Sequence, residues 1–136
     1  MSYGVSAALQ QAIYQRLTAD LELSALVSGA IYDAVPAGII TGTYVSLGPE
    51  DVRERSDMTG HGAVHEVTIN VITDAAGFQG AKRVAAAVSD ALLDAPMTLE
   101  RGTLVYLNFH RARARRVEDA DVRRIDLKFR ARVQDD

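Results

Sequence analysis

The sequence predicts an α+β domain in which a mixed, largely antiparallel sheet of four to five strands carries two main helices packed on one face. Two observations lead to this fold class. Apolar residues recur at three- and four-residue steps in segments 5–19 and 76–93, as in amphipathic helices. Elsewhere apolar and polar residues alternate in several segments, and helices and strands follow one another without a regular repeat, which favours α+β over α/β.

Residues 5–19 form the first predicted helix, with Ser2 or Ser6 as its cap. The run DLELSALV, which begins at Asp20, is expected to add one further helical turn. A short strand is expected at 31–35, because a proline and a glycine follow soon after and end it.

A second strand is predicted at 43–47, where β-branched and aromatic residues alternate before Gly48 and Pro49 interrupt the pattern. The next stretch is highly charged, has few large apolar residues and ends in glycines. We therefore expect 49–62 to be an exposed loop or the tip of a long hairpin. Because such a segment buries little on its own, we expect it to be poorly ordered in an isolated subunit.

The clearest alternation lies at 64–73 and predicts the third strand. An apolar stripe predicts the second helix at 76–93. Two long strands at 104–114 and 122–133, joined by an acidic turn, complete the domain as a terminal hairpin. The predicted core joins the sheet to the second helix and consists of Ile69, Val71, Val84, Val88, Leu107, Ile125 and Leu127.

The composition suits one domain that spans residues 1–136, with 48% hydrophobic residues. The chain has no cysteine, which excludes disulfides, thiolate metal sites and a cysteine nucleophile. Its amino terminus has neither a basic stretch nor an apolar run, and no segment approaches the ~18 apolar residues of a membrane span. We therefore expect a soluble protein made in the cytoplasm, with no membrane partner.

The charge is unevenly distributed along the chain. The net charge is −3, yet residues 1–100 carry 5 basic and 12 acidic side chains, whereas residues 101–136 carry 10 basic and 6 acidic ones. Of the 15 basic residues 13 are arginines. Arginine suits planar, forked pairing with carboxylates or phosphates at interfaces, so this bias indicates that the basic quarter of the chain makes contacts with something.

No motif predicts an enzyme. The acidic residues after Pro49 lack the order of a calcium loop, and arginines interleave with them. His61 and His65 lie on a loop and a strand, where a spacing of four does not bring imidazoles together, so no metal site is predicted. The chain has neither a Gly-x-Ser-x-Gly elbow nor a phosphate loop. We expect no catalytic residue, cofactor or metal; the alternative is a small ligand-binding or hydrolytic domain with an unrecognised pocket.

Arginines alternate along both strands of the predicted hairpin. In the first strand, Val105, Leu107, Phe109 and Arg111 are expected to share one side. Three interpretations stay open: a solvated face that resists edge pairing, a basic edge that pairs with the acidic loop of a neighbouring subunit, and a nucleic-acid contact. Subunit pairing is favoured over nucleic acid, since no aromatic residues interleave with the arginines. The candidate interface residues are Glu50, Asp51, Arg53, Glu54, Arg55, Asp57, Arg111, Arg113, Arg115, Arg130 and Arg132.

The chain resembles the small tail-completion proteins of long-tailed phages, and more narrowly the tail terminators of phage-derived gene transfer agents. The resemblance lies in an ordered combination of segments and extends from YGVSAALQQAIY to the last strand. Its central segments are TYVSLGPEDVRERSD, GHGAVHEVTINVIT and GFQGAKRVAAAVSDALLDAPMTL, followed by RGTLVYLNFHRARARRVEDADVRRIDLKFRARV.

The resemblance implies a structural assembly protein without catalytic residues. Members of this group form a homo-hexameric ring on the head-proximal end of the tail tube, stop its polymerisation and present a surface to neck or head-completion proteins. The implied partners are further copies of the chain, the tube protein and the connector protein, with DNA passing only transiently. The implied location is the head-tail junction of a particle assembled in the bacterial cytoplasm.

Overall fold

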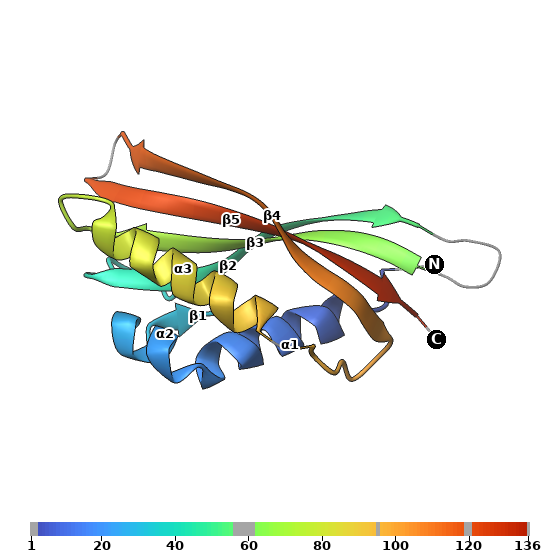
Figure 1. Ribbon diagram of the computed structural model, residues 1–136. Coiled ribbons are helices and arrows are strands. Elements are labelled where there is room, and N and C mark those ends of the chain that lie inside the picture. The colour runs from blue at the N-terminus through green and yellow to red at the C-terminus, as the bar shows by residue number, and fades with distance from the viewer. Residues whose placement is uncertain (1–2, 56–61, 95, 119–120, 136) are drawn as a thin grey trace.

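The chain folds into a five-stranded sheet with three helices on one face, as the computed structural model shows (Figure 1). The structure describes residues 3–55, 62–94, 96–118 and 121–135. The predicted α+β class, the mixed and largely antiparallel sheet and the two main helices on one face are confirmed. No helix in the described part of the chain is long and apolar enough to cross a membrane.

The sheet consists of β1 (Ile31–Tyr32), β2 (Thr43–Glu54), β3 (Gly62–Thr73), β4 (Thr103–Val117) and β5 (Val122–Gln134). Its strand order is β1-β2-β3-β5-β4. β1 is parallel to β2, and every other neighbouring pair is antiparallel. The first strand is shorter than predicted, whereas the second and fourth are longer.

The helices are α1 (Ser6–Ala19), α2 (Leu21–Val27) and α3 (Gln79–Leu93). The carboxylate of Asp20 accepts a hydrogen bond from the Leu23 amide at 2.9 Å, so α2 begins as a separate, capped helix. The expected capping of α1 by Ser6 is wrong: the residue lies within the first turn, and its hydroxyl donates to a side chain of the sheet. α3 begins three residues after the predicted start.

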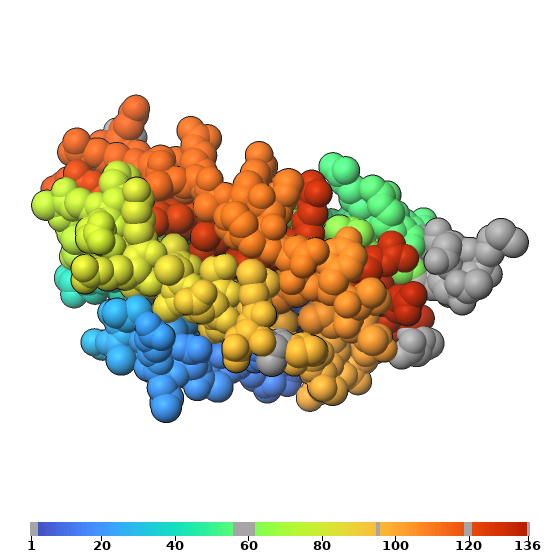
Figure 2. All heavy atoms as spheres, viewed as in Figure 1, coloured from blue at the N-terminus to red at the C-terminus, as the bar shows by residue number. Residues whose placement is uncertain are grey.

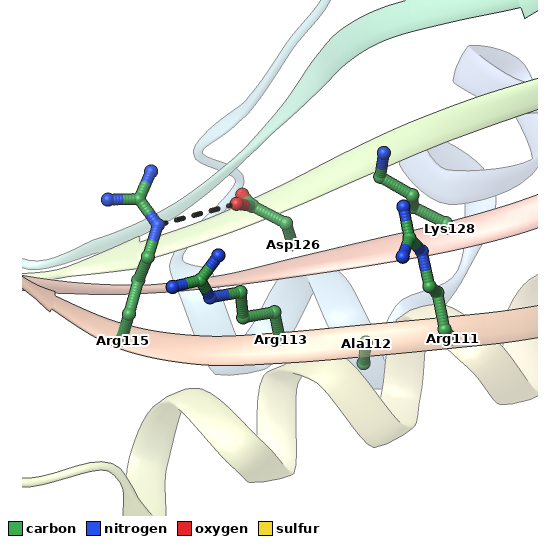
Figure 3. Close-up of a pocket in the computed structure, with 6 residues that line it drawn as sticks. All are labelled: Arg111, Ala112, Arg113, Arg115, Asp126 and Lys128. Atoms are coloured by element: carbon green, nitrogen blue, oxygen red, sulfur yellow. Dashed lines mark ion pairs between the residues drawn. The ribbon is translucent and has the colours of Figure 1, made fainter.

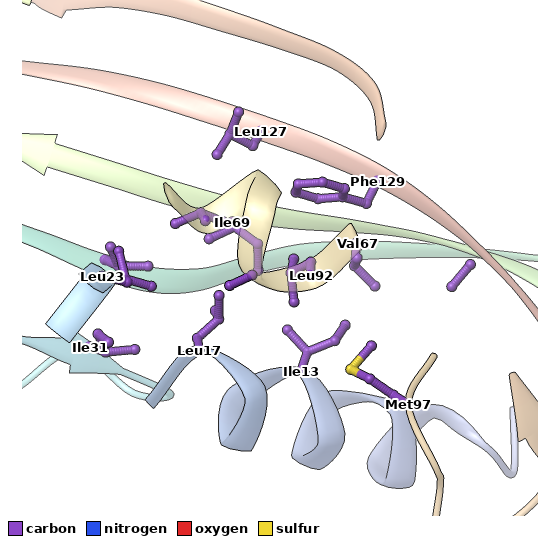
Figure 4. Packing of buried hydrophobic residues seen from close by; sticks show 14 of the residues in the cluster. Ile13, Leu17, Leu23, Ile31, Val67, Ile69, Leu92, Met97, Leu127 and Phe129 are labelled. Carbon is purple, nitrogen blue, oxygen red and sulfur yellow. The ribbon is translucent and has the colours of Figure 1, made fainter. Parts of the chain in front are cut away.

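The core fills the space between the helices and the sheet (Figure 4). Ile13 and Leu17 of α1 belong to one buried cluster with Ile69 of β3 and Phe129 of β5, and all four are at most 2% exposed. Of the predicted core, Leu107 is only half-buried and packs against the margin of this cluster. The other six predicted members are buried: Ile69, Val71, Val84, Val88, Ile125 and Leu127.

The expected loop at 49–62 is wrong for residues 49–54, which continue β2, whereas the interpretation as a long hairpin is right. The register of β2 against β3 shifts between Leu47 and Glu50, so a bulge takes up Gly48 and Pro49. A bulge suits proline, because its missing N–H is not needed by the ladder there. Of the rest of the expected loop, Gly62 begins β3, and residues 56–61 lie outside the described residues.

Candidate interaction surface

One face of the sheet carries the helices, and we call the opposite side the open face (Figure 1). Residues directly opposite each other in neighbouring strands share a face, so the pairing registers assign each side chain. Among the described strand residues, three carboxylates lie on the open face, those of Asp51, Glu66 and Asp126. They are outnumbered by eight basic side chains on the same face, those of Arg53, Arg111, Arg113, Arg115, Arg124, Lys128, Arg130 and Arg132.

A bulge after Phe109 turns the arginines of β4 onto this face. Phe109 lies opposite Phe129 on the helix side, where the two rings pack edge to face at 5.9 Å. The register then shifts, and Arg111 lies opposite Lys128 on the open side. Without this shift Arg111 would share a side with Phe109. The expected grouping of these two residues on one side is therefore wrong, and Arg113 and Arg115 follow Arg111 onto the open face.

The end of the open face near the β4–β5 turn, called the turn end, is hollowed (Figure 3). The hollow has a volume of about 570 Å³. Figure 3 shows its long side chains rising from β4 and β5 on the side of the sheet away from the helix below. Four cations and a single carboxylate line it: Arg111, Arg113, Arg115, Lys128 and Asp126, together with Ala112.

Two carboxylates of the open face are each shared among several cations. Asp126 pairs with Arg124 at 3.0 Å and with Arg115 at 3.9 Å. Glu66 pairs with Lys128 at 3.5 Å and with Arg130 at 3.8 Å. Among the described residues, no carboxylate lies within ion-pair distance of Arg111 or Arg113. Positive charge at the turn end therefore exceeds what the chain itself neutralises.

A second, smaller hollow of about 250 Å³ lies at the other end of the open face, called the far end. Asp51 shares this hollow with Arg53, Arg55 and Arg130, so its carboxylate lies among arginines. The predicted acidic loop thus does not present Asp51 as part of a free acidic surface. Asp57, a candidate interface residue, and His61 lie outside the described residues.

Glu50 faces the helices and is bound within the chain. The Ser6 hydroxyl donates to its two carboxylate oxygens at 2.8 and 3.1 Å. Nδ1 of His65, a side chain with no exposed surface, lies 2.9 Å from the same carboxylate. Glu50 therefore joins α1 to β2 and β3. Sequence reasoning missed this contact, because it placed Glu50 in a loop beyond the end of the strand.

The arrangement of Ser6, Glu50 and His65 differs from a hydrolytic triad. In such a triad the imidazole bonds the serine and the carboxylate orients the imidazole. Here the serine and the imidazole both bond the carboxylate, so the imidazole is not placed against the hydroxyl. The described residues also contain no group of three or more acidic or histidine side chains placed to hold a metal.

One further arginine lies apart from both hollows. Arg101 forms a two-point hydrogen bond with Asp135, with contacts of 3.0 and 2.7 Å. This hydrogen bond and the charge of Asp135 raise the pKa of the Arg101 guanidinium above its ordinary value. Because the group is ionised at working pH in any case, the pair serves to hold the chain end against the segment before β4.

The sheet has an open strand edge on each side. Figure 2 shows β4 (orange) uncovered along the edge of the molecule above α3. Its large apolar side chains Val105 and Phe109 are 52% and 47% exposed. On the opposite side β1 pairs only with Val45 and Ser46, which leaves the 50–54 half of β2 without an outer neighbour among the described residues.

Comparisons with known proteins show the class of protein to which this fold belongs. The family model described as "Tail completion protein gp17" matches residues 11–134. The chain therefore belongs to the tail completion protein gp17 family, whose members are structural proteins of phage tails.

A solved structure described as "Virion of native gene transfer agent (GTA) particle" contains a chain with 66% sequence identity to this one. The match covers 98% of this chain and 99% of that chain, with a TM-score of 0.91. Among the curated proteins searched, none matches. The predicted resemblance to tail-completion proteins, and to those of gene transfer agents in particular, is confirmed.

Proposed function

We propose that this protein caps the head-proximal end of a phage-like tail tube as a hexameric ring, ends tube polymerisation and joins the tail to the neck or head. The observation that carries the proposal is the match over nearly the whole of both chains to a component of a gene transfer agent virion. The two chains share 66% identity and one fold, and the family match independently supports a role in completing the tail.

The two open edges support ring formation. A ring of identical subunits needs two different, complementary surfaces on each copy. β2 and β4 run in opposite directions and lie on opposite sides of the sheet. Placing β4 of one copy beside the 50–54 half of β2 in the next would thus continue the antiparallel sheet and cover Val105.

The candidate interface residues fall into two groups in this proposal: residues at the end of β2 that other proteins can reach, and arginines of the open face that subunit pairing leaves uncovered. Asp51, Arg53, Glu54 and Arg55 lie at or just past the end of β2, where a neighbouring copy, the tube or the neck protein can reach them. Glu50 is left out, because its carboxylate is bound by Ser6 and His65. The arginines of the open face stay uncovered when subunits join edge to edge: Arg111, Arg113, Arg115, Arg130 and Arg132.

Labelled particles test the proposal. A version of the chain with a small carboxy-terminal tag is incorporated into particles, and the tag is located by electron microscopy with a tag-specific label. We expect label only where the tail meets the head, and a quantity of the chain in purified particles of six copies per tail. Label along the tube, at the distal tip or absent from the particle would contradict the proposal.

A further inference from the structure

We propose that the open face binds the phosphate backbone of double-stranded DNA, with Arg111, Arg113 and Lys128 of the turn end as its principal contacts. This activity goes beyond capping the tube and does not require ring formation, since every group involved lies on one subunit. Four features of the surface support it: the uncompensated charge, the placement of like charges against each other, the scarcity of large exposed apolar side chains, and the spacing of the arginines.

The charge of the open face is opposite in sign to that of the whole chain. The chain carries −3, yet eight basic side chains and three carboxylates share this face. Asp126 and Glu66 are each shared between cations, and among the described residues neither Arg111 nor Arg113 has a carboxylate within ion-pair distance, although Arg113 lies opposite Asp126 in the register. Cations gathered on one face in this way attract a polyanion.

Like charges lie directly opposite each other in this part of the sheet. Arg111 faces Lys128 and Arg115 faces Arg124 in the register of β4 and β5. Such cross-strand pairs are unfavourable in an isolated sheet. Asp126 bridges Arg115 and Arg124, but the pair Arg111 and Lys128 has no carboxylate between its members. An external anion placed over the hollow would relieve this repulsion.

The surface chemistry favours phosphate over protein carboxylates. Stable protein interfaces centre on buried apolar and aromatic anchors, whereas interfaces with nucleic acids are more polar and much more positive. Among the described residues, Tyr106 at the far end is the one large apolar side chain exposed on the open face. Within the chain itself, the carboxylate of Glu50 is already bound by Ser6 and His65, and Asp51 shares its hollow with three arginines and Glu66.

The spacing of the arginines suits a line of phosphates. Alternate residues of a strand lie ~7 Å apart, so Arg111 and Arg115 are separated by about 13 Å along β4. A duplex presents roughly eight phosphate charges over that length of its axis. Contacts of this kind read no base sequence and allow the protein to slide along DNA.

The test measures binding of the purified full chain to a short duplex of arbitrary sequence between about 50 and 200 mM salt. The variant is Arg111→Gln combined with Arg113→Gln. The control, Lys82→Gln combined with Arg83→Gln, removes the same charge from the exposed outer side of α3. Polyglutamate serves as a second probe, because it carries carboxylates in place of phosphates.

We expect the wild type to bind the duplex with an affinity that falls linearly on a logarithmic salt scale. The open-face variant should lower that slope by about 2, one for each phosphate contact removed, and the α3 variant should leave it unchanged. The proposal is overturned by no binding at about 50 mM salt, by equal losses in both variants, or by polyglutamate binding as tightly as DNA. A negative result in this binding test would not contradict the proposed position of the chain in the particle, which the tag experiment measures separately.

Discussion

Arg111 and Lys128 lie directly opposite each other across β4 and β5, and both side chains rise from the open face into one hollow (Figure 3). Lys128 is paired with Glu66, whereas Arg111 has no carboxylate within ion-pair distance among the described residues. The chain thus keeps a repulsive pair at the centre of its most basic surface. A fold selected for stability alone would place an acidic residue at one of these two positions.

Replacing Arg111 should therefore stabilise the isolated protein. Arg111→Gln removes the repulsion with Lys128 and is expected to raise the free energy of unfolding by about 0.2–1 kcal/mol at low salt. In 1 M salt, where screening acts over ~3 Å, the gain should shrink. Urea denaturation at the two salt concentrations measures both effects, with Arg83→Gln on α3 as the control. A loss of stability at low salt would show that Arg111 has a favourable partner within the chain.

Removal of two neighbouring carboxylates of β2 should change the stability of the protein by different amounts. Glu50→Ala leaves Nδ1 of the buried His65 and the Ser6 hydroxyl without their acceptor, and we expect it to cost about 1–3 kcal/mol. Asp51→Ala, on the exposed side of the same strand, should change stability by less than about 0.5 kcal/mol. Chemical denaturation of both variants measures the two changes in the free energy of unfolding. Equal, small changes would contradict the contact and would agree with the solvated loop that the sequence predicts for Glu50.

The loss of stability on truncating a core side chain should increase with the burial of that side chain. Leu127 is buried between the sheet and α3, so Leu127→Ala is expected to cost about 2–5 kcal/mol. Leu107 is half-buried at the margin of the same cluster, and Leu107→Ala should cost clearly less. Thermal unfolding of the two variants under identical conditions tests the difference. Equal costs would mean that β4 packs more deeply than the structure shows.

The open edge of β4 should matter for assembly and not for folding. Val105 is 52% exposed, so Val105→Lys should leave the monomer stable while a charge at the edge opposes strand pairing with a neighbour. We expect the variant to be lost from purified particles. Leu21→Lys on α2, where the side chain is 86% exposed, is the matched control and should be incorporated normally. Normal incorporation of the Val105 variant would exclude β4 as the subunit contact.

Most of the fold could be predicted from sequence because its elements depend on local periodicity. The alternation at 64–73 and 122–133 and the stripes of α1 and α3 reflect one buried side per element, which is visible in a single sequence. Boundaries were less accurate where tertiary contacts decide them. β2 continues past Gly48 and Pro49 because β3 supplies its partner and a bulge takes up both residues.

The candidate surface was harder to predict, because bulges reverse the side on which later residues lie. Simple alternation places Arg111 with Phe109, but the shift after Phe109 moves it to the open face. Pairing across the sheet also brings together groups that are distant in sequence. Glu66 of β3 contacts Lys128 and Arg130 of β5, and Glu50 meets Ser6 of α1, none of which local spacing reveals.

The most direct test of the account is electron microscopy of particles assembled in cells that lack this protein, compared with the same cells supplied with it from a plasmid. If the chain ends the tube and joins it to the head, its loss should give tails of abnormal length or tails unjoined to heads, and the plasmid should restore both. Normal numbers of joined particles with tails of normal length in its absence would contradict the account.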